Sequence, residues 1–360
     1  MQTKIMYKKH SITLTPFIYL TPSVSTSSKI ILSALILQVI GLAVTRSFSA
    51  LITTACPLAA SILCEAAFRY CRKNYKYDYV IAVIQGLLTG LLVPQTYPPV
   101  IVFITALLCF AGSKYVFGNF AASWVNPSAL TIAMLFFLDS SFFPGFEITA
   151  HSLQSRNAAL NLIQNGSIKT FSFDYKITDF LNKNIFSFFK IAIPDGYISM
   201  IVDSGSFIPA FRFNLLTIIS LVLFISYSII DYIIPGIFIM AYMLLVRLLL
   251  PVFINGTPLQ GDMILALFSS GTLFYATYLI QWYGTAPLTR TGKCLYGFAA
   301  AIFAFITAGF GTSAAGMVFV VLMLNLLSPL IQYFENKGAQ KCIKKNLLPK
   351  VEMIKETENV

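Results

Sequence analysis

Charged side chains are scarce in this chain of 360 residues, which has only 14 acidic and 25 basic residues. They make up 11% of the sequence, whereas hydrophobic residues make up 57%. A soluble domain has roughly a quarter of its residues charged, because its surface must face water. The composition therefore excludes a soluble fold of this size and predicts an all-α integral membrane protein.

Histidine and metal-binding cysteine patterns are also lacking. Only His10 and His151 are present, and none of the six cysteines forms a CxxC pair. These absences leave few ligands for a zinc or iron–sulfur site and no histidine base for a Ser-His-Asp triad. The sequence has no GxxxxGK[ST] pattern and no GxGxxG pattern between a strand and a helix, which argues against a nucleotide-driven pump and a Rossmann domain.

Ten apolar stretches are long enough to be membrane-spanning helices, given a hydrocarbon thickness of about 30 Å. The predicted spans are 29–47, 49–68, 79–95, 99–117, 126–142, 213–230, 232–253, 263–281, 295–311 and 314–331. The first span follows a polar and mixed segment, and nothing after it resembles a cleavage site. We therefore expect a retained helix there and not a signal peptide.

The distribution of basic residues predicts an orientation. With the N-terminus in the cytoplasm, the segments that fall inside contain most of the Lys and Arg residues, as the positive-inside rule requires. The predicted organisation is a cytoplasmic N-terminal tail (1–28), a first five-helix half (29–142), an external periplasmic loop (143–212), a second five-helix half (213–331) and a cytoplasmic basic tail (332–360). The net charge of +11 then reflects orientation and attraction to the lipid bilayer, and no nucleic-acid partner is expected.

Few charged residues lie in or near the predicted spans, namely Glu65, Lys114, Arg247 and Asp262. A charge inside the membrane is a candidate for function, because leaving it unpaired in hydrocarbon is costly. Arg247 is the sharpest of the four, since it lies midway to the outer end of its helix. Two interpretations stay open: a functional role, or a structural role in which it snorkels to the interface or pairs with a neighbouring helix or protein chain.

Several stretches resemble, in order and spacing, one family of membrane proteins. In the first half these are Pro22–Ser25, Cys64–Ala66 with Arg69–Lys73, Leu87–Pro94 with Pro98–Pro99, and Lys114–Asn119 with Asn126–Ala129. In the second half they are Gly256–Leu259, Phe268–Leu273, Ala276–Thr277, Thr291–Gly297 and Met323–Pro329. Together they span nearly the whole chain and resemble the RnfD protein of the Rnf electron-transport complex and its relative, the NqrB protein of the sodium-translocating NADH:quinone reductase.

This resemblance implies a multi-pass subunit of an ion-translocating, flavin-linked oxidoreductase complex in the bacterial inner membrane. The implied cofactor is a flavin (FMN or riboflavin), and the implied partners are other membrane and peripheral subunits. Gly-rich, hydroxyl-bearing breaks inside helices allow the backbone to approach a ligand, although tight helix packing also explains them. A half-helix starting at Asn126-Pro127 would turn its positive end towards a flavin or an ion. The expected cofactor-binding residues are Asn126, Pro127, Ser270, Gly271, Thr272 and Thr277.

The sequence departs from the family pattern at two places that matter for chemistry. In the family, a threonine of an SGAT-type motif in the outer loop holds FMN through a phosphoester bond. Ser155, Arg156, Asn157 and Ala158 occupy the matching place, so this region is expected to contact flavin. Ala158 stands where the acceptor threonine is expected and has no hydroxyl, so covalent FMN is not expected there. Tyr278-Leu279 replaces an Asp-Pro pair and removes a carboxylate, which suggests a divergent member.

Two alternatives to a redox subunit fit the same sequence. A secondary transporter or vitamin permease would also have ten helices in two halves, and the missing threonine favours it. A scaffold subunit without any cofactor would keep the helices and the partners but bind no flavin. Flavin absorbance and co-purifying redox subunits distinguish these alternatives.

Overall fold

A computed structural model describes residues 22–71, 79–116, 125–143, 170–189, 192–193, 195–282, 286–308 and 313–346. In these ranges all regular elements are helices, as predicted. Four of them are long and apolar enough to cross a membrane: α1 (Val24–Val44), α2 (Phe48–Cys71), α11 (Ile233–Phe253) and the Gly316–Lys341 part of α15 (Gly316–Asn346). The all-helical membrane class is therefore confirmed at this level.

Shorter helices occupy the remaining apolar stretches. In the first half they are α3 (Tyr79–Leu92), α4 (Pro99–Phe110), its π-helical continuation η1 (Ala111–Val116) and α5 (Pro127–Leu138). In the second half they are α10 (Asn214–Ser226), α12 (Met263–Ser269), α13 (Thr272–Tyr278) and α14 (Arg290–Thr307). Each of the ten predicted spans thus contains helix, and the predicted span 263–281 is divided into two short helices.

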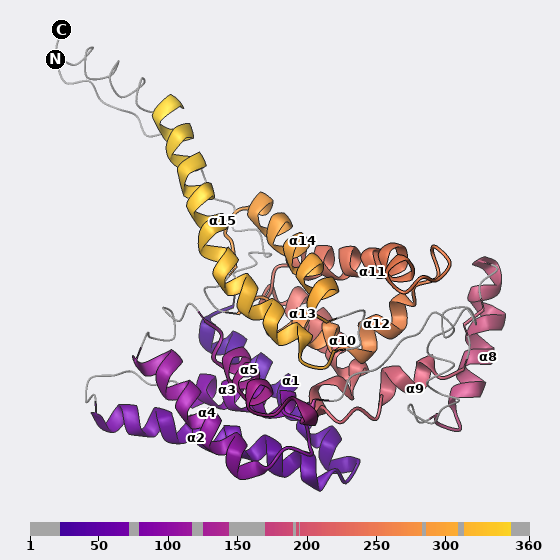
Figure 1. The fold of residues 1–360 in the computed structure, drawn as a ribbon, viewed down its shortest axis with the longest axis horizontal. Helices are drawn as coiled ribbons and strands as arrows, with labels where there is room; N and C mark the ends of the chain where they lie inside the picture. The colour runs from indigo at the N-terminus through magenta and orange to yellow at the C-terminus, as the bar shows by residue number, and fades with distance from the viewer. Residues whose placement is uncertain are drawn as a thin grey trace, which may run out of the picture.

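The two halves of the chain lie side by side (Figure 1), with the first half in indigo to magenta and the second half in orange to yellow. Helices α1 and α10 pack together, and so do α5 and α15, so both contacts join the halves. Within the first half α2 and α3 approach closely, because a Cβ atom on Gly90 would lie 2.5 Å from the Thr54 carbonyl oxygen. Small residues at such contacts are typical of helix packing in membranes.

Helix ends that alternating spans would place on the same side do contact one another. At one side Arg212 forms an ion pair with Asp203 at 2.7 Å and donates a hydrogen bond to Ser47 between α1 and α2. At the other side Lys293 forms an ion pair with Asp231 at 2.5 Å, and Thr289 donates to Glu335 of α15. Large apolar side chains, among them Val44, Val100 and Phe137, are exposed along the helices between these two sides.

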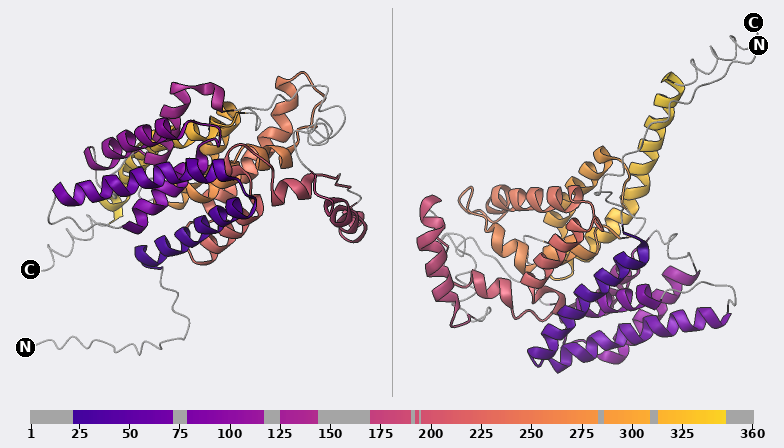
Figure 2. Two further views of the ribbon diagram at one scale, coloured as in Figure 1. Left: turned by 90° about the horizontal axis from the view of Figure 1, so that it is seen from below. Right: turned by 180° about the vertical axis from the view of Figure 1, so that it is seen from behind.

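Several boundaries differ from the sequence-based prediction for local reasons. Helix α1 begins at Val24, not at residue 29, because the Ser23 side chain caps it by accepting a hydrogen bond from the Thr26 amide. Helix α5 ends at Leu138, before residue 142, because Asp139 is extended and caps the next turn, η2 (Ser140–Phe142). Helix α15 continues past residue 331 to Asn346 and projects beyond the other helices (Figure 2).

The segment expected as an external loop contains regular structure where it is described. It includes α8 (Asp174–Asn184), η3 (Phe186–Phe189), α9 (Tyr197–Val202) and η4 (Pro209–Phe211). The buried Asp174 carboxylate joins α8 to α9 by accepting hydrogen bonds from the amides of Gly196 and Ser199 and from the Ser199 hydroxyl. Polar composition predicted exposure here but could not predict this link.

Candidate functional site

The second half contains a break between α12 and α13. Gly271 lies between the two helices with a φ of 70°, a left-handed conformation that favours glycine. The Phe211 ring packs directly on it, so a Cβ atom at Gly271 would lie 1.9 Å from the ring. Both the backbone conformation and the packing therefore require glycine at this position.

Three hydroxyl groups gather at this break. The Ser270 hydroxyl donates to the Ala266 carbonyl oxygen at 2.6 Å and also contacts the Thr272 hydroxyl. The Tyr242 hydroxyl, from the middle of α11, lies beside both. All three side chains are buried. The sequence predicted Ser270 and Thr272 as site residues but missed Tyr242, which comes from a uniformly apolar helix.

Asn214 holds the broken helix in place. Its side-chain Nδ2 donates to the Phe268 carbonyl oxygen of α12 at 3.1 Å and to the Met200 carbonyl oxygen of α9 at 3.0 Å. A helix that ends inside a buried region leaves carbonyl groups without partners, and these are costly in an apolar environment. Asn214 satisfies one of them. A single asparagine at the start of an apolar run was the available sequence signal.

The first half has a separate polar position at the start of α5. The Asn126 Oδ1 atom caps this helix by accepting hydrogen bonds from the amides of Ser128 at 3.0 Å and Ala129 at 3.3 Å, and Pro127 follows in the first turn. Asn126 is fully buried, and its Nδ2 atom has no hydrogen-bond partner among the described residues. A buried amide donor left in this way costs free energy, so it calls for an explanation.

A second unfilled amide lies on the neighbouring helix. Ser128 of α5 donates to the Gln85 carbonyl oxygen of α3 at 3.4 Å, so Gln85 lies beside the start of α5. The Gln85 Nε2 atom is also buried and has no partner in the part of the chain that the structure describes. Sequence reasoning missed Gln85, although a glutamine inside an apolar helix is a visible signal.

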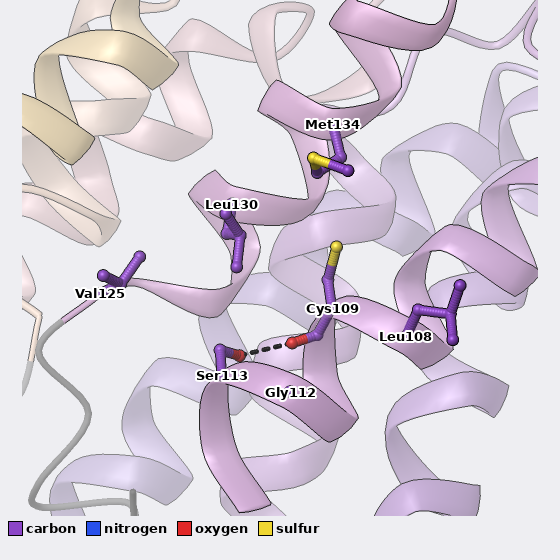
Figure 3. Close-up of a pocket in the computed structure, with 7 residues that line it drawn as sticks. All are labelled: Leu108, Cys109, Gly112, Ser113, Val125, Leu130 and Met134. Carbon is purple, nitrogen blue, oxygen red and sulfur yellow. Dashed lines mark hydrogen bonds between the residues drawn. The ribbon is translucent and has the colours of Figure 1, made fainter. Parts of the chain in front are cut away.

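An apolar cavity of about 410 Å³ adjoins the start of α5 (Figure 3). It lies between the end of α4, η1 and α5, and the Cys109 thiol points between Leu130 and Met134. The wall is open at Gly112, where an added Cβ atom would meet nothing within 4 Å. The lining residues are Leu108, Cys109, Gly112, Ser113, Val125, Leu130 and Met134. Its size suits a small organic ligand, for which sites of roughly 300–1,000 Å³ are usual.

The structure divides the predicted cofactor-binding residues into two groups. Helix α5, with Asn126 and Pro127, packs against α3, α4 and α15, whereas α13 packs against α10, α11 and α12. Thr277 lies at the far end of α13 from the break and donates to the Leu273 carbonyl oxygen at 2.8 Å. The expected flavin-contact region, Ser155, Arg156, Asn157 and Ala158, lies outside the described residues.

Tyr278 occupies the place where a carboxylate was expected from the family pattern. Its ring packs on Phe224 and Phe274 with centroid distances of 5.4 and 4.7 Å. Its hydroxyl lies beside Ser220 and Gln38, and the Gln38 amide donates to Thr217 at 2.9 Å. The position therefore remains polar but holds no carboxylate.

Comparison with known proteins agrees with this organisation. No curated protein matches the chain. The model of the NQR2, RnfD, RnfE family matches residues 11–341. Membership of this family implies a membrane subunit of a multisubunit, ion-translocating Rnf or Nqr redox complex, and members carry covalent FMN. Because the match covers nearly the whole sequence, the chain belongs to the NQR2, RnfD, RnfE family.

Proposed function

We propose that this chain is a flavin-binding, ten-span subunit of an ion-translocating electron-transport complex in the bacterial inner membrane, with both termini in the cytoplasm. Two contacts support this orientation: Arg212 to Ser47 on the proposed outer side and Lys293 to Asp231 on the inner side. Each joins segments that ten alternating spans would place together.

The flavin is proposed to bind without a covalent bond beside the start of α5. The observation that carries this assignment is the pair of buried amide donors, Asn126 Nδ2 and Gln85 Nε2, that have no partner among the described residues. The nitrogen and carbonyl oxygen atoms of a flavin ring accept hydrogen bonds, and such donors would satisfy them. The adjoining apolar cavity lined by Cys109 and Met134 would take the hydrophobic part of the ring.

The outer-loop motif is assigned only a noncovalent role. Ala158 has no hydroxyl to form a phosphoester, so Ser155, Arg156 and Asn157 would at most contact a phosphate or a partner protein. In-gel flavin fluorescence after denaturation tests this point. We expect no fluorescent band, whereas a band that disappears in Ser155→Ala would contradict the assignment.

The break at Ser270–Thr272 is proposed as a position for the translocated ion. Hydroxyl and backbone carbonyl oxygens are the ligands that hard cations prefer, and the break brings both together with the Tyr242 hydroxyl. The short helices place these groups inside the bundle, where an ion crossing the membrane must be coordinated.

The absorbance spectrum of the detergent-extracted complex tests flavin binding. The critical variant is Asn126→Ser, because serine still caps α5 but removes the amide donor. We expect Asn126→Ser and Gln85→Leu to lose flavin absorbance while the protein stays monodisperse. Gly112→Ala is the matched control, since its Cβ atom meets open space. Unchanged flavin content in both variants would refute the assignment.

The same preparation distinguishes the alternative functions. Co-purifying redox subunits together with flavin support the redox assignment. A chain that purifies alone without flavin and takes up a labelled solute would instead be a transporter, and partners without flavin would indicate a scaffold.

A further inference from the structure

Arg247 is a cation on the outward-facing side of a membrane-spanning helix. It belongs to α11, which is long and apolar enough to cross the membrane, and its side chain is exposed. Its neighbours on this face are apolar, with Leu244 57% exposed and Leu248 42% exposed. A guanidinium group on a lipid-facing surface is costly unless an anion or the interface receives it.

The Arg247 side chain extends towards the outer end of α11. It precedes Phe253, the last residue of the helix, by roughly 9 Å at the usual helical rise. Its Nη1 atom donates to the Gly261 carbonyl oxygen at 3.1 Å, and Gly261 lies in the connection between α11 and α12. Gly261 permits this approach, because a Cβ atom there would lie 2.1 Å from the Val246 carbonyl oxygen. The guanidinium therefore lies near the outer headgroup region.

The nearby carboxylate of Asp262 is already occupied. Its Oδ2 atom accepts from the Tyr197 hydroxyl at 2.5 Å, and its Oδ1 atom accepts from the Leu265 amide at 2.9 Å. Burial, together with this carboxylate, raises the pKa of Tyr197, so its hydroxyl stays protonated as the donor. Among the described residues no carboxylate forms an ion pair with Arg247. Arginine has five N–H donors, and most remain available to an external anion.

An apolar groove begins at Arg247 and continues towards the middle of the helix. Its cavity has a volume of about 310 Å³ and is lined by Met240, Met243, Leu244, Arg247, Leu248 and Met263. Met240, Met243 and Leu244 precede Arg247 in α11, so they lie deeper in the membrane. This order, with a cation near the interface and flexible apolar side chains below it, matches a phospholipid of the outer leaflet.

We propose that Arg247 and this groove bind one phospholipid of the outer leaflet. The guanidinium holds the phosphate by charge-assisted hydrogen bonds, and Met240, Met243 and Leu244 contact an acyl chain. A lipid fits better than a partner carboxylate, because the groove continues inward as an apolar channel from a single cation. The proposal uses the orientation given under the proposed function but does not depend on flavin.

Native mass spectrometry of the purified protein with added phosphatidylglycerol tests this site. We expect one retained lipid on the wild-type chain and binding at least about tenfold weaker in Arg247→Gln, because a charge-assisted hydrogen bond is lost. Arg247→Lys should bind at intermediate strength, since lysine cannot form a bidentate contact with phosphate. Leu244→Trp, which fills the groove and keeps the cation, should also weaken retention.

The matched control is Arg46→Gln, which removes an exposed cation from the same side but outside the groove. Equal retention by Arg247→Gln and wild type would overturn the proposal. A partner protein that dissociates from Arg247→Gln, with lipid retention unchanged, would overturn it in favour of a protein carboxylate. Flavin absorbance should be normal in Arg247→Gln, so failure of the lipid site and failure of flavin binding are separate results.

Discussion

Replacing Gly271 by alanine should destabilise the protein by about 2–5 kcal/mol. Part of this cost is the left-handed backbone at a φ of 70°, which costs a residue with a Cβ atom about 1–2 kcal/mol. The rest is overpacking, about 1–3 kcal/mol, because the new Cβ atom would lie 1.9 Å from the Phe211 ring. The two contributions have different origins and can be separated.

A double-mutant cycle with Phe211→Leu makes this separation. Leucine shortens the side chain that packs on Gly271, so Gly271→Ala in that background should cost only the backbone strain of about 1–2 kcal/mol. The assay is the fraction of detergent-solubilised protein that remains monodisperse after heating. Gly112→Ala is the control and should be close to wild type or slightly more stable, since its Cβ atom meets nothing within 4 Å. A Gly271→Ala variant as stable as wild type would refute the reasoning.

Three further perturbations test the supports of the fold. Asn214→Leu should lower thermal stability by about 1–3 kcal/mol, because the Phe268 carbonyl oxygen loses its side-chain donor; wild-type stability would contradict this. Gly90→Ala should cost about 1–3 kcal/mol through the close α2–α3 contact, again measured against Gly112→Ala. Burial acts to raise the pKa of Asp174, but hydrogen bonds from Ser199, Gly196 and Thr178 outweigh it, and the pKa lies below its usual 3.8. Its stabilisation is therefore present above about pH 4 and lost on acidification below it, so proteolysis of α8 should rise there in wild type and be pH-insensitive in Asp174→Asn.

The sequence predicted the class and the positions of the helices well, because long apolar runs have few alternatives in a membrane. It predicted the break at Ser270–Thr272 from the local composition of hydroxyl residues and glycine. It could not predict that α15 continues to Asn346, since a polar segment after a span is compatible with either helix or coil. The Asp174 link between α8 and α9 also escaped prediction, because it depends on contacts between residues distant in sequence.

The candidate site was predicted in parts but not in arrangement. The order of motifs along the chain indicated Asn126 and Ser270, but order contains no distances, and the structure places them on helices with different neighbours. Gln85 and Tyr242 were missed because each is a single polar residue in an apolar helix. Such residues become informative only when the structure shows that they are buried and what lies beside them.

The substitution of Tyr278 for a carboxylate bears on which step this chain supports. A buried carboxylate would attract a cation by charge, whereas Tyr278, Gln38 and Thr217 offer only neutral dipoles. Neutral oxygens still coordinate a dehydrated ion, but they bind it more weakly and release it more readily. The hydroxyls at Ser270 and Thr272 are neutral as well, and α13, which begins at Thr272, ends at Tyr278. A path along α13 would therefore pass an ion between weak sites, and the energy for directional transport would have to come from redox changes in partner proteins.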